Sequence, residues 1–288
     1  MKKTLLLLVV VMLAMTLVVS GCAKPASDTQ TDGTTPPVND DGATTDGSTD
    51  DSWTKVQEKG YLTVGLDDTF APMGFRDEAN EVVGYDIDLG NAVAEKLGIE
   101  MHWTPCDWDG IMLSLNSGDI DAIWNGLSIT EERQKQIDFT APYMNDDQII
   151  VVAGDSTIST KADLAGKVLG YQIGSSSADA VESDPDTLAS LKEVKKYPGF
   201  SECLLDLTNG RIDAVCVDSV FFYYYETTAQ STFKVLDEDF GSEPLAVGFR
   251  KTDDALQAKV EEAFNAIKAD GTASEICIKW FGEDLVVK

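Results

Sequence analysis

The spacing of apolar and polar residues predicts alternating strands and helices beyond residue 60. Residues 99–103 alternate between apolar and polar side chains, which predicts a strand with one buried face. Leu256, Val260, Phe264 and Ile267 recur at the spacing of one helix face. Because short strands and helices alternate along the chain, we predict an α/β fold.

An internal repeat divides the folded part into two similar units. Leu115–Ile123 reads LNSGDIDAI and Leu207–Val215 reads LTNGRIDAV, so a helix end, a glycine stop and a strand recur. A repeat of this kind predicts two lobes of similar construction. Aligned on the repeat, Gly126 matches Asp218, and both follow a predicted strand. Open α/β sheets place their ligands at this end of their strands.

The segment Asn125–Tyr143 in the first lobe combines groups that suit an anion. It follows a predicted buried strand, residues 122–124, and a glycine turn leads into a predicted helix. Ser128 precedes Glu131 by three residues, the spacing of a capping box, and Arg133 falls near the first turn. Free N–H groups, a positive helix end and a guanidinium suit a carboxylate. In the alternative interpretation, Ser128 only caps the helix and Arg133 pairs with an acidic residue.

The second lobe offers a carboxylate, Asp218, at the matching position. A ligand with an anionic and a cationic end fits between Arg133 and Asp218. The α-carboxylate and α-ammonium groups of an amino acid are such ends. The sequence therefore indicates an amino-acid site between the lobes.

Other candidate residues also lie near predicted strand ends. Residues 172–177 (QIGSSS) form a turn with hydroxyls and free N–H groups, although a solvated helix cap is the alternative. Residues 67–75 are predicted to form an irregular loop. Phe70 and Trp108 are each expected to precede a helix, where they either pack in the core or flank a ligand's side chain.

A further helix is predicted after Gly84, and Gly98 ends it. Asp86 and Asp88 at its start complement the helix dipole, which is a sufficient structural role for both. Asn80, before this helix, is suited to a left-handed turn.

The N-terminal segment predicts export and lipid attachment. A basic start is followed by an apolar run, residues 5–19, as in a secretory signal. An uncleaved anchor helix is the alternative, but the run is short for a bilayer. The sequence VSGC at 19–22 resembles the lipobox of bacterial lipoproteins, which implies a lipid on Cys22 and a membrane anchor without a spanning helix. Residues 23–52 contain almost no apolar side chains and are predicted to be a disordered tether.

Charge and reactive side chains exclude several classes of function. The net charge of −28 makes nucleic acid an improbable partner, because nothing neutralises phosphates. His102, the single histidine, falls on the polar side of its predicted strand, so no catalytic role is expected. We expect no cofactor and no metal, and we expect free thiols, because the remaining cysteines match no zinc or redox motif. These are Cys106, Cys203, Cys216 and Cys277.

From Trp53 to Gly282 the chain resembles the extracellular solute-binding proteins, family 3 type, of ABC-type polar amino-acid importers. The resemblance rests on three blocks in the right order. They are Gly84–Leu89 (GYDIDL) with Val93, Ala94 and Leu97; Leu127–Thr130 (LSIT) with Arg133, Asp138, Phe139, Pro142 and Tyr143; and Lys279–Gly282 (KWFG). The chain departs from the family pattern at Asn80, where a glycine is usual, which affects a turn and not the site.

The resemblance implies a two-lobed fold of the periplasmic-binding-protein type II, with two strands crossing between the lobes. The expected domains are a lipoprotein signal peptide at 1–21, the lipidated Cys22 with its tether at 22–52, a first lobe at 53–147 and 242–288, and a second lobe at 148–241. The protein is expected to act as a monomer, anchored by lipid on the extracytoplasmic face of the membrane.

The resemblance also implies roles for the site residues. Arg133 would hold the α-carboxylate with Ser128 and Ser176, and Asp218 would hold the α-ammonium. The positions expected to line the rest of the site are Asp67, Phe70, Trp108, Asn125, Gly126, Gln172 and Ser175. Arginine or lysine, glutamine and cystine are the candidate ligands, and an ABC permease with its ATPase is the expected partner.

Two rival functions stay open on the sequence alone. Similar folds include dehydratases that act on cyclic acids, but no nucleophile–base pair or metal spacing is visible here. A sensor domain would normally continue into a transmembrane signalling region, and the chain ends at Lys288.

Overall fold

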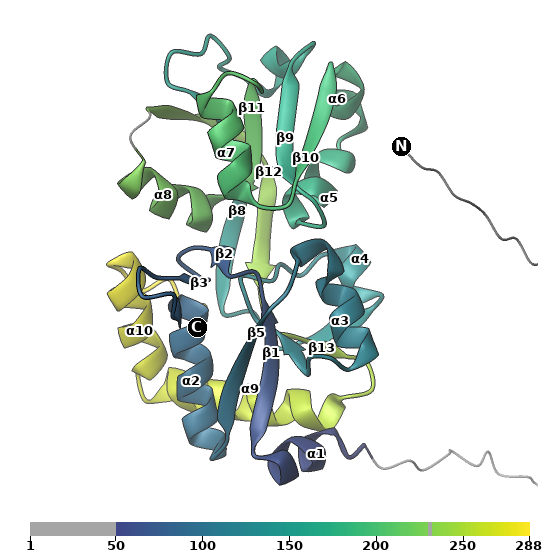
Figure 1. Cartoon of the computed structure of the whole chain (residues 1–288), viewed down its shortest axis with the longest axis vertical. Helices are drawn as coiled ribbons and strands as arrows, with labels where there is room; N and C mark the ends of the chain where they lie inside the picture. Colours follow the sequence, from purple (N-terminus) through teal and green to yellow (C-terminus); the bar gives the residue numbers. More distant parts are fainter. Residues whose placement is uncertain (1–49, 230–231) are drawn as a thin grey trace, which may run out of the picture. The chain divides into compact units, whose positions relative to one another are not determined.

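The computed structural model describes residues 50–229 and 232–288, which fold into two α/β lobes (Figure 1). The predicted signal segment, Cys22 and residues 23–49 of the predicted tether lie outside the described residues. Within the described part, no helix has the length and apolar character needed to cross a membrane.

The first lobe is built around a five-stranded mixed sheet in the order β5-β1-β6-β13-β7. Strand β1 is parallel to both β5 and β6, whereas β13 is antiparallel to β6 and β7. Its strands are β1 (Tyr61–Leu66), β5 (Glu100–Pro105), β6 (Ala122–Ile123), β7 (Ile137–Phe139) and β13 (Gly248–Arg250). Helices α1 (Ser52–Lys59), α2 (Tyr85–Leu97), η1 (Trp108–Gly110), α3 (Ile111–Ser117), α4 (Glu131–Gln134), α9 (Asp254–Ala269) and α10 (Thr272–Phe281) surround it.

A small three-stranded sheet follows β1 in the same lobe. It is formed by β2 (Thr69–Phe70), β3 (Gly74–Arg76) and β4 (Val82–Val83). The prediction of an irregular loop at residues 67–75 is therefore wrong. Phe70 lies in a strand and does not precede a helix. Phe70 pairs with Gly74 across two very short strands, and the sequence of these strands shows no alternation of apolar and polar residues that would have predicted them.

The second lobe has its own five-stranded sheet in the order β10-β9-β11-β8-β12. Strands β9, β10 and β11 are parallel, and β8 runs antiparallel to β11 and β12. The strands are β8 (Met144–Ala153), β9 (Val168–Gln172), β10 (Glu193–Tyr197), β11 (Ala214–Asp218) and β12 (Phe233–Leu245). The helices are η2 (Lys161–Leu164), α5 (Ser176–Glu182), α6 (Pro185–Ser190), α7 (Phe200–Thr208) and α8 (Ser219–Thr228).

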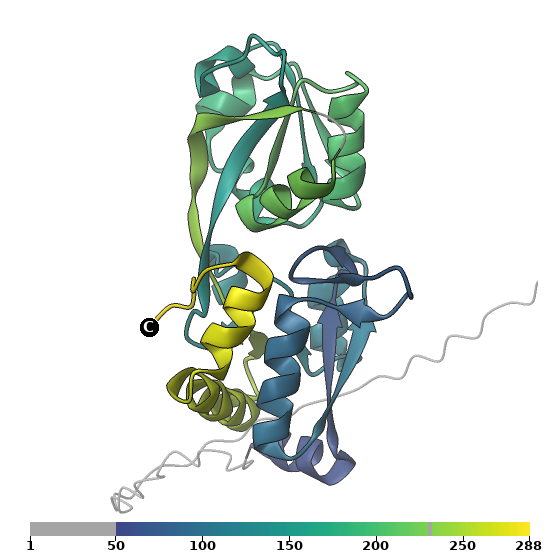
Figure 2. The same cartoon turned by 90° about the vertical axis from the view of Figure 1, so that its left-hand side faces the viewer.

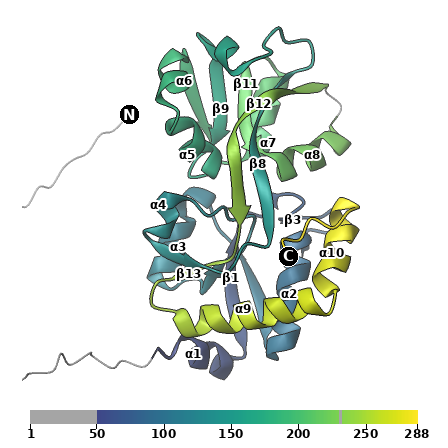
Figure 3. The ribbon, with the colours of Figure 1, turned by 180° about the vertical axis from the view of Figure 1, so that it is seen from behind.

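Strands β8 and β12 pass from one lobe to the other as an antiparallel pair (Figures 2 and 3). Their register shifts between Val235 and Asp239 and again between Asp239 and Ser242. After β12 the chain returns to the first lobe, where α10 packs beside α2 (Figure 3). Both ends of the described chain therefore belong to the first lobe.

The sequence repeat corresponds to a structural repeat. Asp121 in the first lobe accepts a hydrogen bond from Thr63 N at 2.9 Å, and Asp213 in the second accepts one from Val168 N at 2.8 Å. In both cases the aspartate joins the start of the repeat's strand to the neighbouring parallel strand, β1 in the first lobe and β9 in the second. Pairing of β1 with β6 follows the same register as pairing of β9 with β11. The prediction of two similar lobes is confirmed.

Each lobe has a buried glycine opposite the isoleucine of the repeat. A Cβ added at Gly65 would collide with Ile120 Cδ1, and one at Gly170 would lie 2.8 Å from Ile212 Cδ1. The side chains of Ile120 and Ile212 fill the space that the glycines leave. Close packing of this kind leaves no room for a methyl group.

Apolar side chains fill both faces of each sheet. In the first lobe, α2 and α9 cover one face and α3 the other. In the second, α5 covers one face, while α7 and α8 cover the other. The predicted face of α9 is buried as expected, from Leu256 to Ile267.

Several local predictions are also confirmed. Asn80 has a φ of 64°, and Gly98 ends α2 in the left-handed conformation. The four cysteines of the described part are free, with Cys216 buried in β11. His102 is exposed and stacks on Tyr61, with the ring centroids 3.9 Å apart.

The glycine packing predicts a specific loss of stability. Gly65→Ala should lower the free energy of unfolding by about 1 to 3 kcal/mol, because the added methyl group overpacks the interface with Ile120. Ile120→Val removes the colliding atom, so the double variant should be more stable than the sum of the two single effects predicts. Denaturant unfolding measures all three.

Gly110→Ala is the matched control. Its added Cβ meets nothing within 4 Å, so its stability should stay close to that of the parent protein. Equal effects of Gly65→Ala and Gly110→Ala would contradict the packing explanation.

Candidate functional site

A pocket lies between the lobes, at the C-terminal ends of β1, β6, β9 and β11. The empty space between its lining atoms is about 250 Å³, which includes space open to solvent. The structure brings together ten of the predicted site residues as its lining: Asp67, Phe70, Trp108, Asn125, Gly126, Arg133, Gln172, Ser175, Ser176 and Asp218. The eleventh, Ser128, lies immediately behind them, with its Oγ 3.0 Å from Ser176 Oγ. Residues from both lobes therefore form one site.

The helix that carries Arg133 is short and begins later than predicted. Thr130 is its N-cap, and Thr130 Oγ1 accepts a hydrogen bond from Arg133 N at 3.2 Å. The capping box predicted for Ser128 and Glu131 is therefore wrong. Ser128 does not cap the helix, because its backbone forms a β-bridge with Leu245 at the end of β12. Its hydroxyl is thereby directed at the second lobe and not at the helix.

The guanidinium of Arg133 is buried and linked to both lobes. Its residue is 7% exposed, Nη1 donates to Ser128 O at 3.0 Å, and Nη2 donates to Gly174 O at 3.0 Å. It also lies over the Trp108 ring, 5.8 Å from the centroid. Burial lowers the pKa of Arg133, and the negative charges of Asp179, Glu243 and Asp218 oppose this shift. Within the described residues it forms no ion pair, so a carboxylate ligand would supply the missing anion.

Asp218 lies at the junction of β11 and α8. It is 4% exposed, and its Oδ1 accepts a hydrogen bond from Gln148 Nε2 at 2.8 Å. Burial raises the pKa of Asp218, whereas hydrogen bonds from Asp146 and Gln148 and the charge of Arg133 act in the opposite direction. No lysine or arginine in the described ranges lies within ion-pair distance of its carboxylate. Asp218 is therefore suited to a cationic group.

Asp67 and Gln172 come from equivalent strand ends of the two lobes and meet across the pocket. Gln172 Nε2 donates to Asp67 Oδ2 at 2.7 Å, and Thr69 donates to Asp67 Oδ1 through its N and Oγ1 at 2.9 and 2.6 Å. Asn125 Oδ1 accepts from Asp67 N at 3.0 Å. Burial raises the pKa of Asp67. This part of the pocket offers both donors and acceptors.

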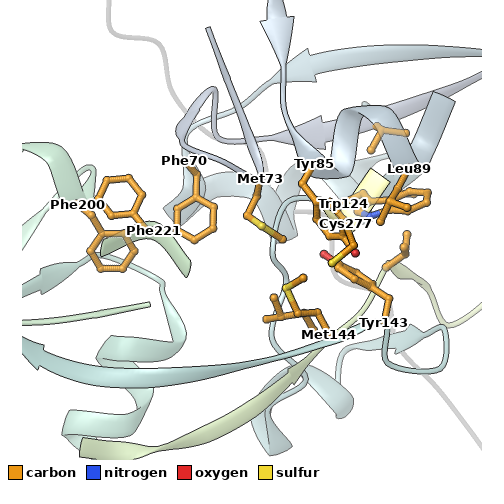
Figure 4. Packing of buried hydrophobic residues seen from close by; sticks show 14 of the residues in the cluster. Phe70, Met73, Tyr85, Leu89, Trp124, Tyr143, Met144, Phe200, Phe221 and Cys277 are labelled. Carbon is orange, nitrogen blue, oxygen red and sulfur yellow. The ribbon is translucent and has the colours of Figure 1, made fainter. Parts of the chain in front are cut away.

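Aromatic rings form the apolar wall of the site. Phe70 lies next to Phe221 and Phe200 of the second lobe, with ring centroids 5.5 and 6.0 Å away (Figure 4). Gly126 has a φ of 59°, and a Cβ there would lie 2.8 Å from the Phe70 ring, so only glycine fits.

The sequence interpretation missed the packing of Phe200 against the site residue Phe70, and it placed Phe221 only in a packed helix. The repeat contained a usable signal for Phe200. When the alignment of the two copies is extended toward the N-terminus, Trp108 is paired with Phe200. Phe221 had no comparable signal. Its position against Phe70 depends on how the lobes meet.

Asp86 has a role that its predicted effect on the helix dipole does not explain. The residue is 0% exposed, and its Oδ2 accepts hydrogen bonds from Gly126 N at 2.7 Å and Tyr143 Oη at 3.0 Å. It thereby fixes the pocket loop at Gly126. Burial raises the pKa of Asp86 to about 7. Asp88 instead accepts hydrogen bonds from Lys279 and Trp280 of α10.

Comparison with known proteins identifies the family. Residues 62–283 match the model of the bacterial extracellular solute-binding proteins, family 3. This chain belongs to that family. Membership makes it a solute-binding protein rather than an enzyme, as predicted.

Relatives of this solute-binding protein extend over most of its length. The L-cystine-binding protein TcyJ of Escherichia coli (strain K12) is 32% identical over 80% of this chain and 86% of its own. The ABC transporter arginine-binding protein 1 of the same strain is 34% identical over 76% of this chain and 90% of its own.

A solved structure shows the same fold. The substrate-binding protein of an ABC uptake transporter from Streptococcus pneumoniae, crystallised with bound histidine, superposes with a TM-score of 0.79. It is 42% identical, and the match covers 83% of this chain and 99% of that one. The predicted two-lobed type II fold is confirmed.

No group of three or more histidine, cysteine or acidic side chains in the described part of the chain is arranged to hold a metal ion. The lining of the pocket instead consists of hydrogen-bonding groups, one guanidinium and aromatic rings.

Asp86 predicts a pH dependence of stability. The pKa of an unfolded aspartate is about 3.9, so between pH 4 and 7 the folded protein binds one more proton at Asp86 than the unfolded chain. This stabilisation is fully present below pH 4 and declines by about 1.4 kcal/mol per pH unit as the pH rises toward 7. Asp86→Asn should therefore show a flatter fall of unfolding free energy between pH 5 and 7.

Tyr143→Phe is the matched control for Asp86. It keeps the carboxyl group but removes a donor that lowers its pKa, so the decline should extend to higher pH. Urea unfolding at several pH values measures both effects. Identical slopes in Asp86→Asn and the parent protein would refute the assignment.

Proposed function

We propose that this solute-binding protein binds a polar L-amino acid between its two lobes and delivers it to the permease of an ABC importer. The observation that carries the proposal is the pair Arg133 and Asp218. Both are buried, both line one pocket, and neither has an ionic partner among the described residues. Arg133 binds the α-carboxylate, with Ser128 and Ser176 as further donors, and Asp218 binds the α-ammonium.

The other end of the pocket supports a ligand whose side chain forms hydrogen bonds. Asp67 and Gln172 present acceptors and donors, and Phe70 and Trp108 flank the path to them. Relatives are named for L-cystine and arginine, and a similar structure contains histidine. We therefore propose arginine or lysine, glutamine, cystine or histidine as the ligand.

Binding is coupled to closure of the lobes. The first lobe comprises 53–147 and 242–288, the second comprises 148–241, and the hinge lies in β8 and β12. Contacts from Arg133 to Gly174 and from Ser128 to Ser176 form only when the lobes meet. A ligand that contacts both lobes binds this state better than an open one and therefore shifts the equilibrium toward it.

A dehydratase-like reaction has less support. A general acid in the pocket would have to be an aspartate, since Asp67 and Asp218 are its only titratable lining residues besides Arg133 in the described part. Asp67 is already held by Thr69 and Gln172. The family consists of binding proteins, which favours binding without chemistry.

We also propose that the mature protein is a monomer anchored by a lipid on Cys22. The support is the VSGC sequence after the apolar run, and Cys22 lies outside the described residues. The acidic, weakly apolar segment after it would act as a tether between the membrane and the first lobe.

The binding proposal predicts a loss of affinity in Arg133→Ala. A panel of common amino acids and cystine is screened by thermal shift, because a bound ligand raises the melting temperature. For the amino acid with the largest shift, Arg133→Ala should weaken binding by about 2 to 5 kcal/mol, since the carboxylate loses its charged partner in a buried site.

Arg211→Ala is the matched control. Arg211 is an exposed arginine of the second lobe that pairs with Asp206, so its removal should leave the affinity unchanged. Stabilisation by a cyclic carboxylic acid and by no amino acid would reject the proposal and favour the enzyme.

The anchor proposal predicts a change of location in Cys22→Ser. The parent protein should fractionate with the membrane and incorporate a labelled fatty acid. The variant should do neither, because a serine cannot accept the lipid thioether. Membrane association that survives in Cys22→Ser would indicate an uncleaved signal helix instead.

A further inference from the structure

A second buried carboxyl group lies beside Asp218. Asp146, in β8, is 2% exposed. Its Oδ1 accepts hydrogen bonds from Ser219 Oγ at 2.5 Å and from Val220 N at 3.0 Å. These two donors belong to the first turn of α8, directly after Asp218. Asp146 therefore holds the end of α8 from a strand that crosses between the lobes.

The other oxygen of Asp146 has no donor directed at it. Asp146 Oδ2 is buried and finds no donor among the described residues. Because Asp146 Oδ1 is bonded to Ser219 and Val220, the carboxyl group of the preceding residue, Asp218, lies beside Asp146, and each of the two carboxyl groups shifts the pKa of the other. Two carboxylates are both acceptors, so a hydrogen bond between them requires one proton. Two buried carboxyl groups side by side do not both ionise.

The surroundings decide which of the two groups carries the proton. Gln148 Nε2 donates to Asp218 Oδ1, and Ser177 Oγ donates to Gln148 Oε1, which fixes the orientation of this amide. Arg133 adds a favourable charge on Asp218. No comparable support reaches Asp146 Oδ2. The negative charge is therefore placed on Asp218 and the proton on Asp146.

Other titratable groups lie on the elements packed against the pair. Glu243 of β12 lies within 3.5 Å of Gln148 Nε2, and Cys216 precedes Asp218 in β11. Burial and the charge of Asp218 raise the pKa of Asp146 well above its ordinary value. Arg133 is the cation of the described part whose charge acts on the pair, and it acts through Asp218.

We propose that Asp146 is a positioning residue for the ligand's cationic group. It remains protonated at neutral pH, donates its proton to Asp218, and holds the ionised Asp218 carboxylate at the pocket. The role of Asp218 in binding rests on the proposed function above, whereas the proton on Asp146 does not.

The first test needs no ligand. Infrared spectra of the purified protein at neutral pH, compared with those of Asp146→Asn, should show loss of the carbonyl band of one protonated carboxyl group. Asp86→Asn is measured in parallel, so that a band from the other buried aspartate is recognised. Absence of this difference between the parent protein and Asp146→Asn would overturn the proposal.

The second test compares two substitutions of similar size. In Asp146→Asn the amide N–H replaces the proton donor, and the amide oxygen still accepts from Ser219 and Val220. Asp146→Leu provides neither group. Dissociation constants for L-arginine, L-histidine and L-cystine are measured by calorimetry at neutral pH. Asn should stay within about threefold of the parent, whereas Leu should weaken binding about tenfold or more.

The pH profile separates positioning from a purely structural role. The hydrogen bond from Asp146 lowers the pKa of Asp218, so its loss in Asp146→Leu should move the acid-side loss of affinity to higher pH. Asp146→Asn should keep the parent profile. A structural role at α8 alone would weaken binding equally at every pH, and that outcome would overturn the proposal.

The two proposals fail in different ways. If Arg133→Ala binds these amino acids as the parent does, the proposed function fails while the infrared result still decides the proton on Asp146. If Asp146→Asn loses affinity tenfold while Arg133→Ala behaves as expected, only the role of Asp146 is rejected.

Discussion

The buried guanidinium of Arg133 is the group on which the rest of the site depends. It is held by carbonyl groups of both lobes, Ser128 O on its own and Gly174 O on the other, and no carboxylate neutralises it within the described residues. A buried charge without a counterion is costly, so the cost is reduced whenever an anion enters the pocket. Because the second carbonyl belongs to the opposite lobe, the geometry that receives the anion exists only when the lobes are in contact. Neutralisation of the Arg133 charge by a ligand and closure of the two lobes are therefore coupled.

The repeated construction of the lobes explains how a nearly symmetric frame recognises a ligand with two different ends. Equivalent strand ends carry Asp67 and Gln172, and equivalent positions of the sequence repeat carry Gly126 and Asp218. The frame supplies matched positions, and different residues at those positions provide opposite chemistry. In the first lobe the glycine permits a close approach to Phe70, whereas in the second the carboxylate attracts a cation. The two different ends of the ligand are therefore recognised by different residues at equivalent positions of the two lobes, and not by two different folds.

Aspartates that surround the pocket serve structural purposes at a cost in desolvation. Asp86 fixes the Gly126 loop, and Asp146 holds the first turn of α8, directly after Asp218. Both are buried, and neither forms an ion pair with another residue that the structure describes, so burial raises the pKa of each. The protein is strongly acidic, with a net charge of −28, yet burial favours the protonated form of these two inner carboxyl groups. Their protonation links the shape of the site to pH.

The sequence alone determined the fold class, the repeat and most of the pocket lining. These features are local patterns: the periodicity of strands and helices, the two copies of the Ile-Asp-Ala segment, and the charged residues after them. Local patterns can be read from the sequence before the fold is known. Tertiary structure decided which distant side chains meet. Asp86 and Gly126 are 40 residues apart, and Asp67 and Gln172 are 105 apart. Their contacts, like that between Asp146 and Asp218, depend on how the sheets pack and how the lobes face each other, and no short-range spacing encodes that arrangement.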